Sequence, residues 1–126
     1  MTGSFTIVDP DTVPPESFPE SGLSHRKLTE RLGCTELRLN MITLSPGEAT
    51  APHAHRSQEE VYIALDGGVL ELNGEVHAVE PQSTVRIDPA VVRSVRNESS
   101  ADQTWLLIGA PPVGSIDDFG EYIMPD

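Results

Sequence analysis

Turn-forming residues interrupt this chain so often that a long helix has little room to form. Its 126 residues include 11 prolines and 10 glycines, and the segments between them are short and of strand character. Strands are expected over residues 36–44, 60–65, 69–72, 75–79, 84–87, 91–96 and 103–110. Asn73-Gly74, between two of these segments, is the dipeptide most typical of a tight hairpin turn. Many short strands at this spacing predict an all-β sandwich or barrel.

The length fits one domain, covering residues 1–126. Residues 1–22 are rich in proline and are expected to form an extended N-terminal arm, with one edge strand at residues 5–8. Residues 36–112 are predicted to form the barrel core, and residues 113–126 a C-terminal tail. The last strand, at residues 103–110, is almost continuously apolar, which predicts burial on both of its faces.

Charge excludes two classes of partner. The formal net charge is −12, and such a surface repels nucleic-acid backbones and anionic membranes. Lys27 is the only lysine, a composition that suits a cytoplasm of high salt, although an ordinary acidic protein is the alternative. No apolar run is long enough to span a membrane and no secretion leader is recognisable, so a cytoplasmic location is expected. Cys34, the single cysteine, allows no internal disulfide and is expected to be a small buried residue.

The residues with the clearest chemical potential are His53, His55 and Glu60. Histidines at i and i+2 point to one face of an extended strand, and a carboxylate follows within one loop. Two imidazoles and one carboxylate suit a divalent transition metal such as Zn, Mn, Fe, Ni or Co, and leave coordination positions open for water or a substrate. The pair His-x-His alone is weak, because most such pairs are structural or lie on the surface.

The surrounding residues strengthen this interpretation, because the stretch from Gly47 to Gly67 resembles the first motif of the cupin superfamily. That motif reads Gly-x5-His-x-His-x3,4-Glu-x6-Gly, and all five of its fixed positions are matched here. The resemblance implies a double-stranded β-helix (jelly-roll) barrel that holds one divalent metal through the two histidines and a glutamate. The spacing to Gly67 favours Glu60 over Glu59 as that glutamate, and Glu59 is expected to face solvent.

The second motif of the superfamily, Gly-x5-Pro-x-Gly-x2-His-x3-Asn, is only partly matched. Asn97 is retained, but Arg93 stands where the resemblance places a histidine ligand. A guanidinium cannot coordinate a metal, and it repels a nearby divalent ion. Three alternatives follow: a three-ligand metal site with Arg93 turned towards an anionic substrate, a metal-free site in which Arg93 pairs with Glu60, or an Arg93 that points outwards.

Tyr62 shares strand parity with Glu60, so we expect its side chain, together with that of Arg93, to line a substrate pocket. Met41 and Trp105 are further candidates for the lining, although core packing explains both equally well. His25 and His77 are expected on the surface.

Two classes of function remain open: a metal-dependent enzyme acting on a small organic molecule, and a non-catalytic protein that binds a small molecule. In either class a homodimer is expected, because the alternating Val61, Ile63 and Leu65 would expose an apolar strand face.

Overall fold

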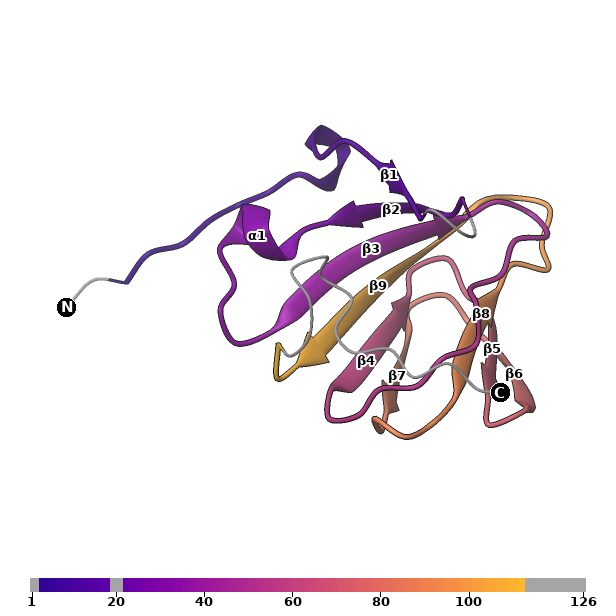
Figure 1. Ribbon diagram of the computed structural model, residues 1–126. Coiled ribbons are helices and arrows are strands. Elements are labelled where there is room, and N and C mark those ends of the chain that lie inside the picture. Colours follow the sequence, from indigo (N-terminus) through magenta and orange to yellow (C-terminus); the bar gives the residue numbers. More distant parts are fainter. Residues whose placement is uncertain (1–2, 19–21, 113–126) are drawn as a thin grey trace.

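The computed structural model describes residues 3–18 and 22–112, and these residues form two antiparallel β-sheets that face each other (Figure 1). The larger sheet has the strand order β1-β2-β3-β9-β4-β7 and the smaller one β6-β5-β8. Along the chain the strands are β1 (Glu16–Ser17), β2 (Ser24–Lys27), β3 (Arg38–Leu44), β4 (Glu59–Ala64), β5 (Gly68–Leu72), β6 (Glu75–Val79), β7 (Ser83–Ile87), β8 (Arg93–Arg96) and β9 (Gln103–Ala110). A 3-10 turn, η1 (Pro10–Thr12), and one short helix, α1 (Thr29–Leu32), precede β3. The all-β prediction is confirmed.

The strands from β3 to β9 begin and end within two residues of the sequence prediction. The N-terminal part was predicted less well. No strand forms at residues 5–8, and the short hairpin of β1 and β2 extends the larger sheet instead. The prediction of an edge strand at residues 5–8 was wrong because a strand needs a neighbouring edge to bond. In this chain the edge beside β3 is taken by β2.

The core lies between the two sheets and is built from side chains on their inner faces. Leu44, Ala64, Leu70 and Trp105 are completely buried, and Tyr62 meets the Trp105 ring edge-on at a centroid distance of 6.3 Å. The indole of Trp105 lies directly against the backbone of the smaller sheet at Gly68, where an added Cβ would come within 2.7 Å of the ring. Close approach of the two sheets at this point therefore requires a residue without a side chain.

The strand β9 lies in the middle of the larger sheet, between β3 and β4. Its inner face carries Trp105, which is fully buried, whereas Leu106 and Ile108 on the outer face are half-buried. The prediction of burial on both faces therefore holds for one face only. Met41 pairs with Leu106 and belongs to the same outer face, so it does not line the interior.

Two expectations about single side chains were wrong. His25 is 4% exposed and stacks on Phe18 at a centroid distance of 4.0 Å, because the additional β1–β2 hairpin turns it towards the core. Burial lowers the pKa of His25. Cys34 is half-buried and not fully buried, whereas His77 is exposed as expected. Among the described residues, no helix has the length and apolar character needed to cross a membrane.

Candidate metal centre

The two histidines reach the barrel interior because the segment leading to them runs beside β8. His53 and Arg93 lie directly opposite each other as an antiparallel bridge, with backbone hydrogen bonds in both directions of 3.1 and 2.8 Å. The two motif glycines stand at turns on either side, Gly47 with φ of 85° and Gly67 with φ of 79°. Residues with a side chain rarely adopt such angles. Glycine at these two positions is therefore what lets the chain enter and leave the segment in this geometry.

Glu60 comes from the other sheet, so the site joins the two halves of the barrel. The ligand atoms of His53, His55 and Glu60 all lie within 4.8 Å of one another, and His55 Nε2 is 3.0 Å from Glu60 Oε1. His55 and Glu60 are 1% and 8% exposed. The adjacent Glu59 is exposed and pairs with Arg86 on the outer surface. Of the two glutamates, the structure thus brings Glu60 to the histidines.

Hydrogen bonding and burial set the protonation of His53. Its Nδ1 lies 3.1 Å from the carbonyl oxygen of Ala51, and because a carbonyl can only accept, Nδ1 carries a proton and donates it. The lone pair then belongs to Nε2, which is the usual arrangement in a histidine that binds metal. Burial, above all, lowers the pKa of His53 to about 4. The ring is therefore neutral near pH 7, the state that coordination requires.

These three side chains fit a divalent transition metal. Two neutral imidazoles and a carboxylate form a donor set that Zn, Mn, Fe, Co and Ni accept. Two ligands about 2.1 Å from one ion, at an angle between 90° and 110°, are about 3.0 to 3.4 Å apart. The 3.0 Å between His55 Nε2 and Glu60 Oε1 lies in this range.

Arg93 does not point outwards. Its side chain is completely buried, and Nε lies 3.5 Å from Glu60 Oε1. Both terminal nitrogens donate to backbone carbonyls at 3.2 Å, those of Pro89 and Asp88. Backbone atoms thus hold the guanidinium beside Glu60, so its position does not depend on the carboxylate alone.

Two further side chains belong to the surroundings of Glu60. The Tyr62 hydroxyl donates to Glu60 Oε1 at 3.3 Å, in agreement with the expected strand parity. Gln58 precedes them on the same strand face and is 1% exposed. It covers Gly109, the residue opposite Glu60 on β9, so closely that a Cβ there would lie 2.6 Å from the Gln58 side chain. Gln58 was not predictable from the sequence, because a glutamine in a polar loop has the pattern of a solvent residue.

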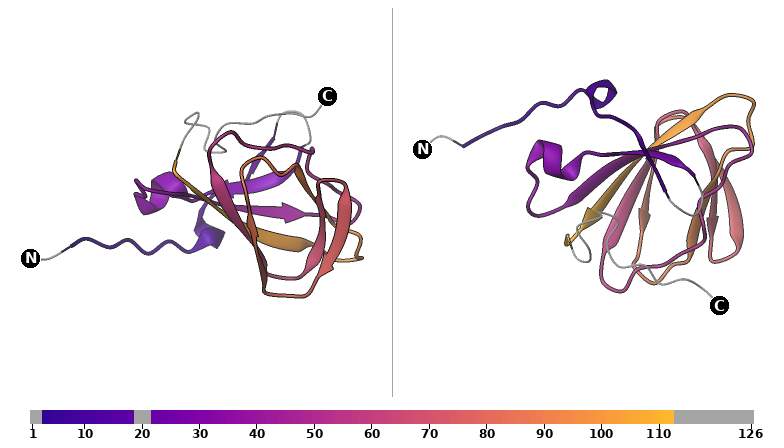
Figure 2. Two further views of the ribbon diagram at one scale, coloured as in Figure 1. Left: turned by 90° about the horizontal axis from the view of Figure 1, so that it is seen from below. Right: turned by 45° about the horizontal axis from the view of Figure 1, so that its top comes forward.

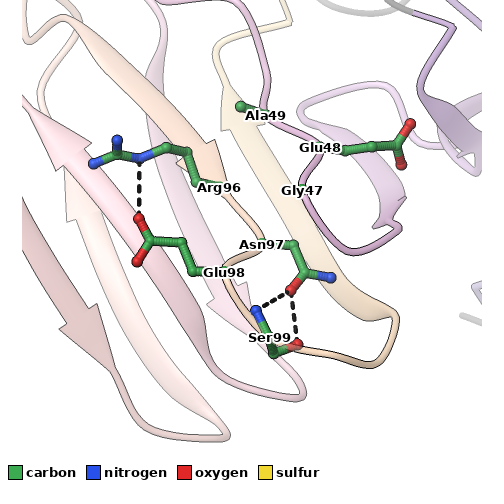
Figure 3. Close-up of a pocket in the computed structure, with 7 residues that line it drawn as sticks. All are labelled: Gly47, Glu48, Ala49, Arg96, Asn97, Glu98 and Ser99. Carbon is green, nitrogen blue, oxygen red and sulfur yellow. Dashed lines mark hydrogen bonds and ion pairs between the residues drawn. The ribbon is translucent and has the colours of Figure 1, made fainter.

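Asn97, the retained residue of the second motif, is structural in this chain. Its amide nitrogen donates to the carbonyls of Leu44 and Ala101, both at 2.8 Å, and its Oδ1 accepts from Ser99. It also borders a hollow of about 350 Å³ (Figure 3), which is lined by Gly47, Glu48, Ala49, Arg96, Asn97, Glu98 and Ser99. His53, His55 and Glu60 do not line this hollow. The two carboxylates that do line it already have partners: Glu48 accepts from the backbone N–H of Ser45, and Glu98 pairs with Arg96.

Comparison with known proteins identifies the family. The family described as Cupin domain matches residues 40–109, and no curated protein matches the sequence. Many solved structures share the fold. A sugar phosphate isomerase of the cupin superfamily from Silicibacter pomeroyi has a TM-score of 0.73 at 20% identity, covering 83% of this chain and 75% of that one.

For a predicted oxalate decarboxylase from Thermotoga maritima the TM-score is 0.74 at 19% identity, with 84% and 99% of the two chains covered. The polyketide cyclase RemF from Streptomyces resistomycificus has a TM-score of 0.71 at 23% identity, with 90% of this chain and 89% of that one covered. At these identities the likeness shows the fold alone, whereas the family match extends over more than half of the sequence. The chain belongs to the cupin domain family, and its two sheets form a cupin barrel.

Proposed function

We propose that this protein binds one divalent transition metal (Zn, Mn, Fe, Ni or Co) through His53, His55 and Glu60 and acts on a small organic molecule at that site. The observation that carries the proposal is the convergence of the three ligand atoms inside the barrel, within 4.8 Å of one another. The family match agrees with it, since many cupins hold a metal with this motif.

The chain's own residues would hold the ion and orient the molecule that binds it. With three protein ligands, a bound ion would keep coordination positions for water or a small molecule. A bound divalent metal would supply Lewis-acid polarisation of a ligand oxygen or, if redox-active, dioxygen chemistry. The Tyr62 hydroxyl, 3.3 Å from Glu60, holds that carboxylate and lies close enough to the site to contact a bound molecule.

Electrostatics favour an anionic small molecule. With neutral histidines, the charges of Glu60 and Arg93 cancel, so a divalent ion would leave the buried site with a net charge of about two positive units. Burial strengthens the attraction between this charge and an anionic ligand, because the dielectric constant of the surroundings is low. Arg93 therefore acts on the ligand through its charge, while its nitrogens remain on Glu60 and the backbone carbonyls.

Metal reconstitution tests the proposal. Untagged protein is stripped with a chelator, dialysed against each metal in turn and measured by elemental analysis. We expect about one equivalent of at least one metal in the natural chain and less than a tenth in His53→Ala and Glu60→Gln. Glu59→Gln is the matched control, because this glutamate is adjacent but exposed, and it should retain the full equivalent. Failure of every metal to bind the natural chain would contradict the proposal.

The second candidate function is a metal-free protein that binds a small molecule without catalysis. The ion pair between Arg93 and Glu60, at 3.5 Å, favours it, because the guanidinium supplies the positive charge that a metal would otherwise bring. At 3.5 Å this ion pair is long, and the backbone carbonyls hold Arg93 independently of Glu60. A metal can therefore bind without displacing the guanidinium, and we place this function second. A cytoplasmic location remains an expectation from the sequence.

A further inference from the structure

Arg38 begins β3 and lies on the inner face of the larger sheet, at the end that holds the metal centre. Side chains alternate between the two faces of a strand, so Arg38 shares the inner face with Asn40, which is 3% exposed, and not the outer face with Met41. Arg38 is half-buried, and its Nε is buried. The start of β3, the end of β9 and the start of β4 lie side by side (Figures 1 and 2). Arg38 is opposite Gly109, which is opposite Glu60, so the arginine and the metal ligand stand in one row across the inner face.

Lys27 brings a second cation to the same place. It lies opposite Asn40 on β2 and is therefore a diagonal neighbour of Arg38, at a separation that long side chains bridge. Its Nζ is 3.8 Å from Glu16 Oε1, but Glu16 is exposed, and such an ion pair at the surface is weak. The chain has only 8 basic residues and a net charge of −12. Two neighbouring cations on an inner face therefore create a local positive potential that favours an anionic ligand.

The floor between Arg38 and Glu60 is formed by Gln58, which lies over Gly109. A Cβ on Gly109 would come within 2.6 Å of the Gln58 side chain, so the glycine leaves the space that the glutamine occupies. Gln58 Nε2 donates to the carbonyl oxygen of Pro111 at 3.0 Å, which fixes the amide in this position. Two strand spacings separate the Cα atoms of Arg38 and Glu60, about 10 Å. A ligand that reaches from a metal on Glu60 to Arg38 therefore needs polar groups at both ends of a short chain.

On the basis of the proposed function, we propose that the small molecule is elongated and anionic at both ends, with one end on the metal and the other bound by Arg38 and Lys27. A guanidinium carries five N–H donors in a planar fork, so it can bind a carboxylate or a phosphate through two parallel hydrogen bonds while its other donors keep their partners. Lys27 adds a point charge to the same group. With about 10 Å between the Cα atoms at the two ends, linear diacids of about four to six carbons have the required length. Arg38 is then a specificity-determining residue, because it contacts the end of the ligand that the metal does not.

Isothermal titration calorimetry of the metal-loaded chain tests the proposal with three probes. Glutarate carries a carboxylate at each end, valerate has the same carbon chain with one carboxylate, and 4-phosphonobutyrate carries a phosphonate in place of one carboxylate. We expect glutarate or 4-phosphonobutyrate to bind at least tenfold more tightly than valerate, and the tighter of the two identifies the anionic group that Arg38 receives. In Arg38→Gln this preference should fall at least fivefold. The affinity for valerate should stay within twofold, because valerate has no charge at the Arg38 end.

Arg31→Gln is the matched control, since Arg31 is exposed on α1 and its substitution removes the same charge. This variant should keep the natural preference. Arg38→Lys should retain part of the preference, because it keeps the charge but not the fork. Lys27→Met is a second variant that should lower the preference at least threefold, and it keeps the test decisive if Arg38→Gln does not fold.

Elemental analysis of each sample before titration separates this inference from the proposed function. A chain that holds one equivalent of metal but binds the three probes with equal affinity would overturn the inference and leave the metal centre intact. An Arg38→Gln chain with the natural preference would do the same. A natural chain that takes up no metal would refute the proposed function, and the inference with it.

Discussion

Replacing Arg93 with methionine should strengthen metal binding while weakening the metal-free fold. Arg93 Nε lies 3.5 Å from Glu60 Oε1, and a metal on that oxygen would be about 2.1 Å away from it. The ion and the guanidinium nitrogen are therefore no more than about 5.6 Å apart. At an effective dielectric constant of about 20 to 40, a divalent ion and a unit positive charge at this separation repel by about 3 to 6 kcal/mol.

Removing that repulsion raises the expected affinity of Arg93→Met at least about 100-fold, since about 1.4 kcal/mol corresponds to a factor of ten. The metal-free variant should lose about 3 to 5 kcal/mol of stability, because Glu60 stays buried without its cation and two backbone carbonyls lose their donors. Neutralising the carboxylate as well, in Arg93→Met/Glu60→Gln, should recover part of that stability but abolish metal binding.

Arg93→His separates charge from coordination. Residue 93 lies directly opposite His53, so a histidine there can reach the same ion and should raise the affinity beyond that of Arg93→Met. Competition with a chelator of known affinity measures the binding constants, and urea unfolding measures the stability of the metal-free forms. An Arg93→Met affinity equal to or below that of the natural chain would refute the reasoning, because it would mean that the guanidinium does not act on a bound ion.

Three further predictions concern the site and the core. The pKa of His53 is lowered to about 4, whereas in the unfolded chain it should have its ordinary value of about 6.5. Below pH 6.5 the unfolded chain therefore binds more protons than the folded one. The free energy of unfolding of the metal-free protein should fall by up to about 3 kcal/mol between pH 6.5 and pH 4. Urea titrations should show this loss, and His53→Gln should remove most of it. Tyr62→Phe deletes the hydroxyl that donates to Glu60 and should cost about 1 to 2 kcal/mol of stability, seen as a lower melting temperature. Gly68→Val places a side chain where Trp105 already lies within 2.7 Å and should cost about 1 to 3 kcal/mol, with a changed tryptophan emission; natural emission and stability would show that the sheets do not meet there.

The barrel was predictable because its strands alternate between clear turn signals. Asn73-Gly74 closes a hairpin whose partners, β5 and β6, pair as the sequence indicated. The β1–β2 hairpin escaped notice because Glu16–Ser17 and Ser24–Lys27 are polar. Their pairing depends on an open edge of β3, which is tertiary information. The burial of His25 follows from that hairpin and was missed for the same reason.

The grouping of His53, His55 and Glu60 was predictable for a different reason. The spacing of these three residues between Gly47 and Gly67 is determined by the geometry of the segment, which has a turn at each glycine. The position of Arg93 was not predictable. An arginine at the first residue of a strand has the pattern of a surface residue, and its burial depends on two carbonyls, of Asp88 and Pro89, that only the folded loop brings into reach. Sequence left three arrangements open, and the structure excludes the one in which Arg93 points outwards, because its side chain is buried beside Glu60.

The most direct test of the metal centre is an anomalous difference map from crystals grown with the metal that binds in reconstitution, recorded on both sides of its absorption edge. We expect a single peak in each barrel, within about 2.3 Å of Nε2 of His53, Nε2 of His55 and a carboxylate oxygen of Glu60. The Arg93 guanidinium should still donate to the carbonyls of Asp88 and Pro89. A barrel without a peak at full metal loading, or a peak held by other residues, would contradict the proposed metal centre.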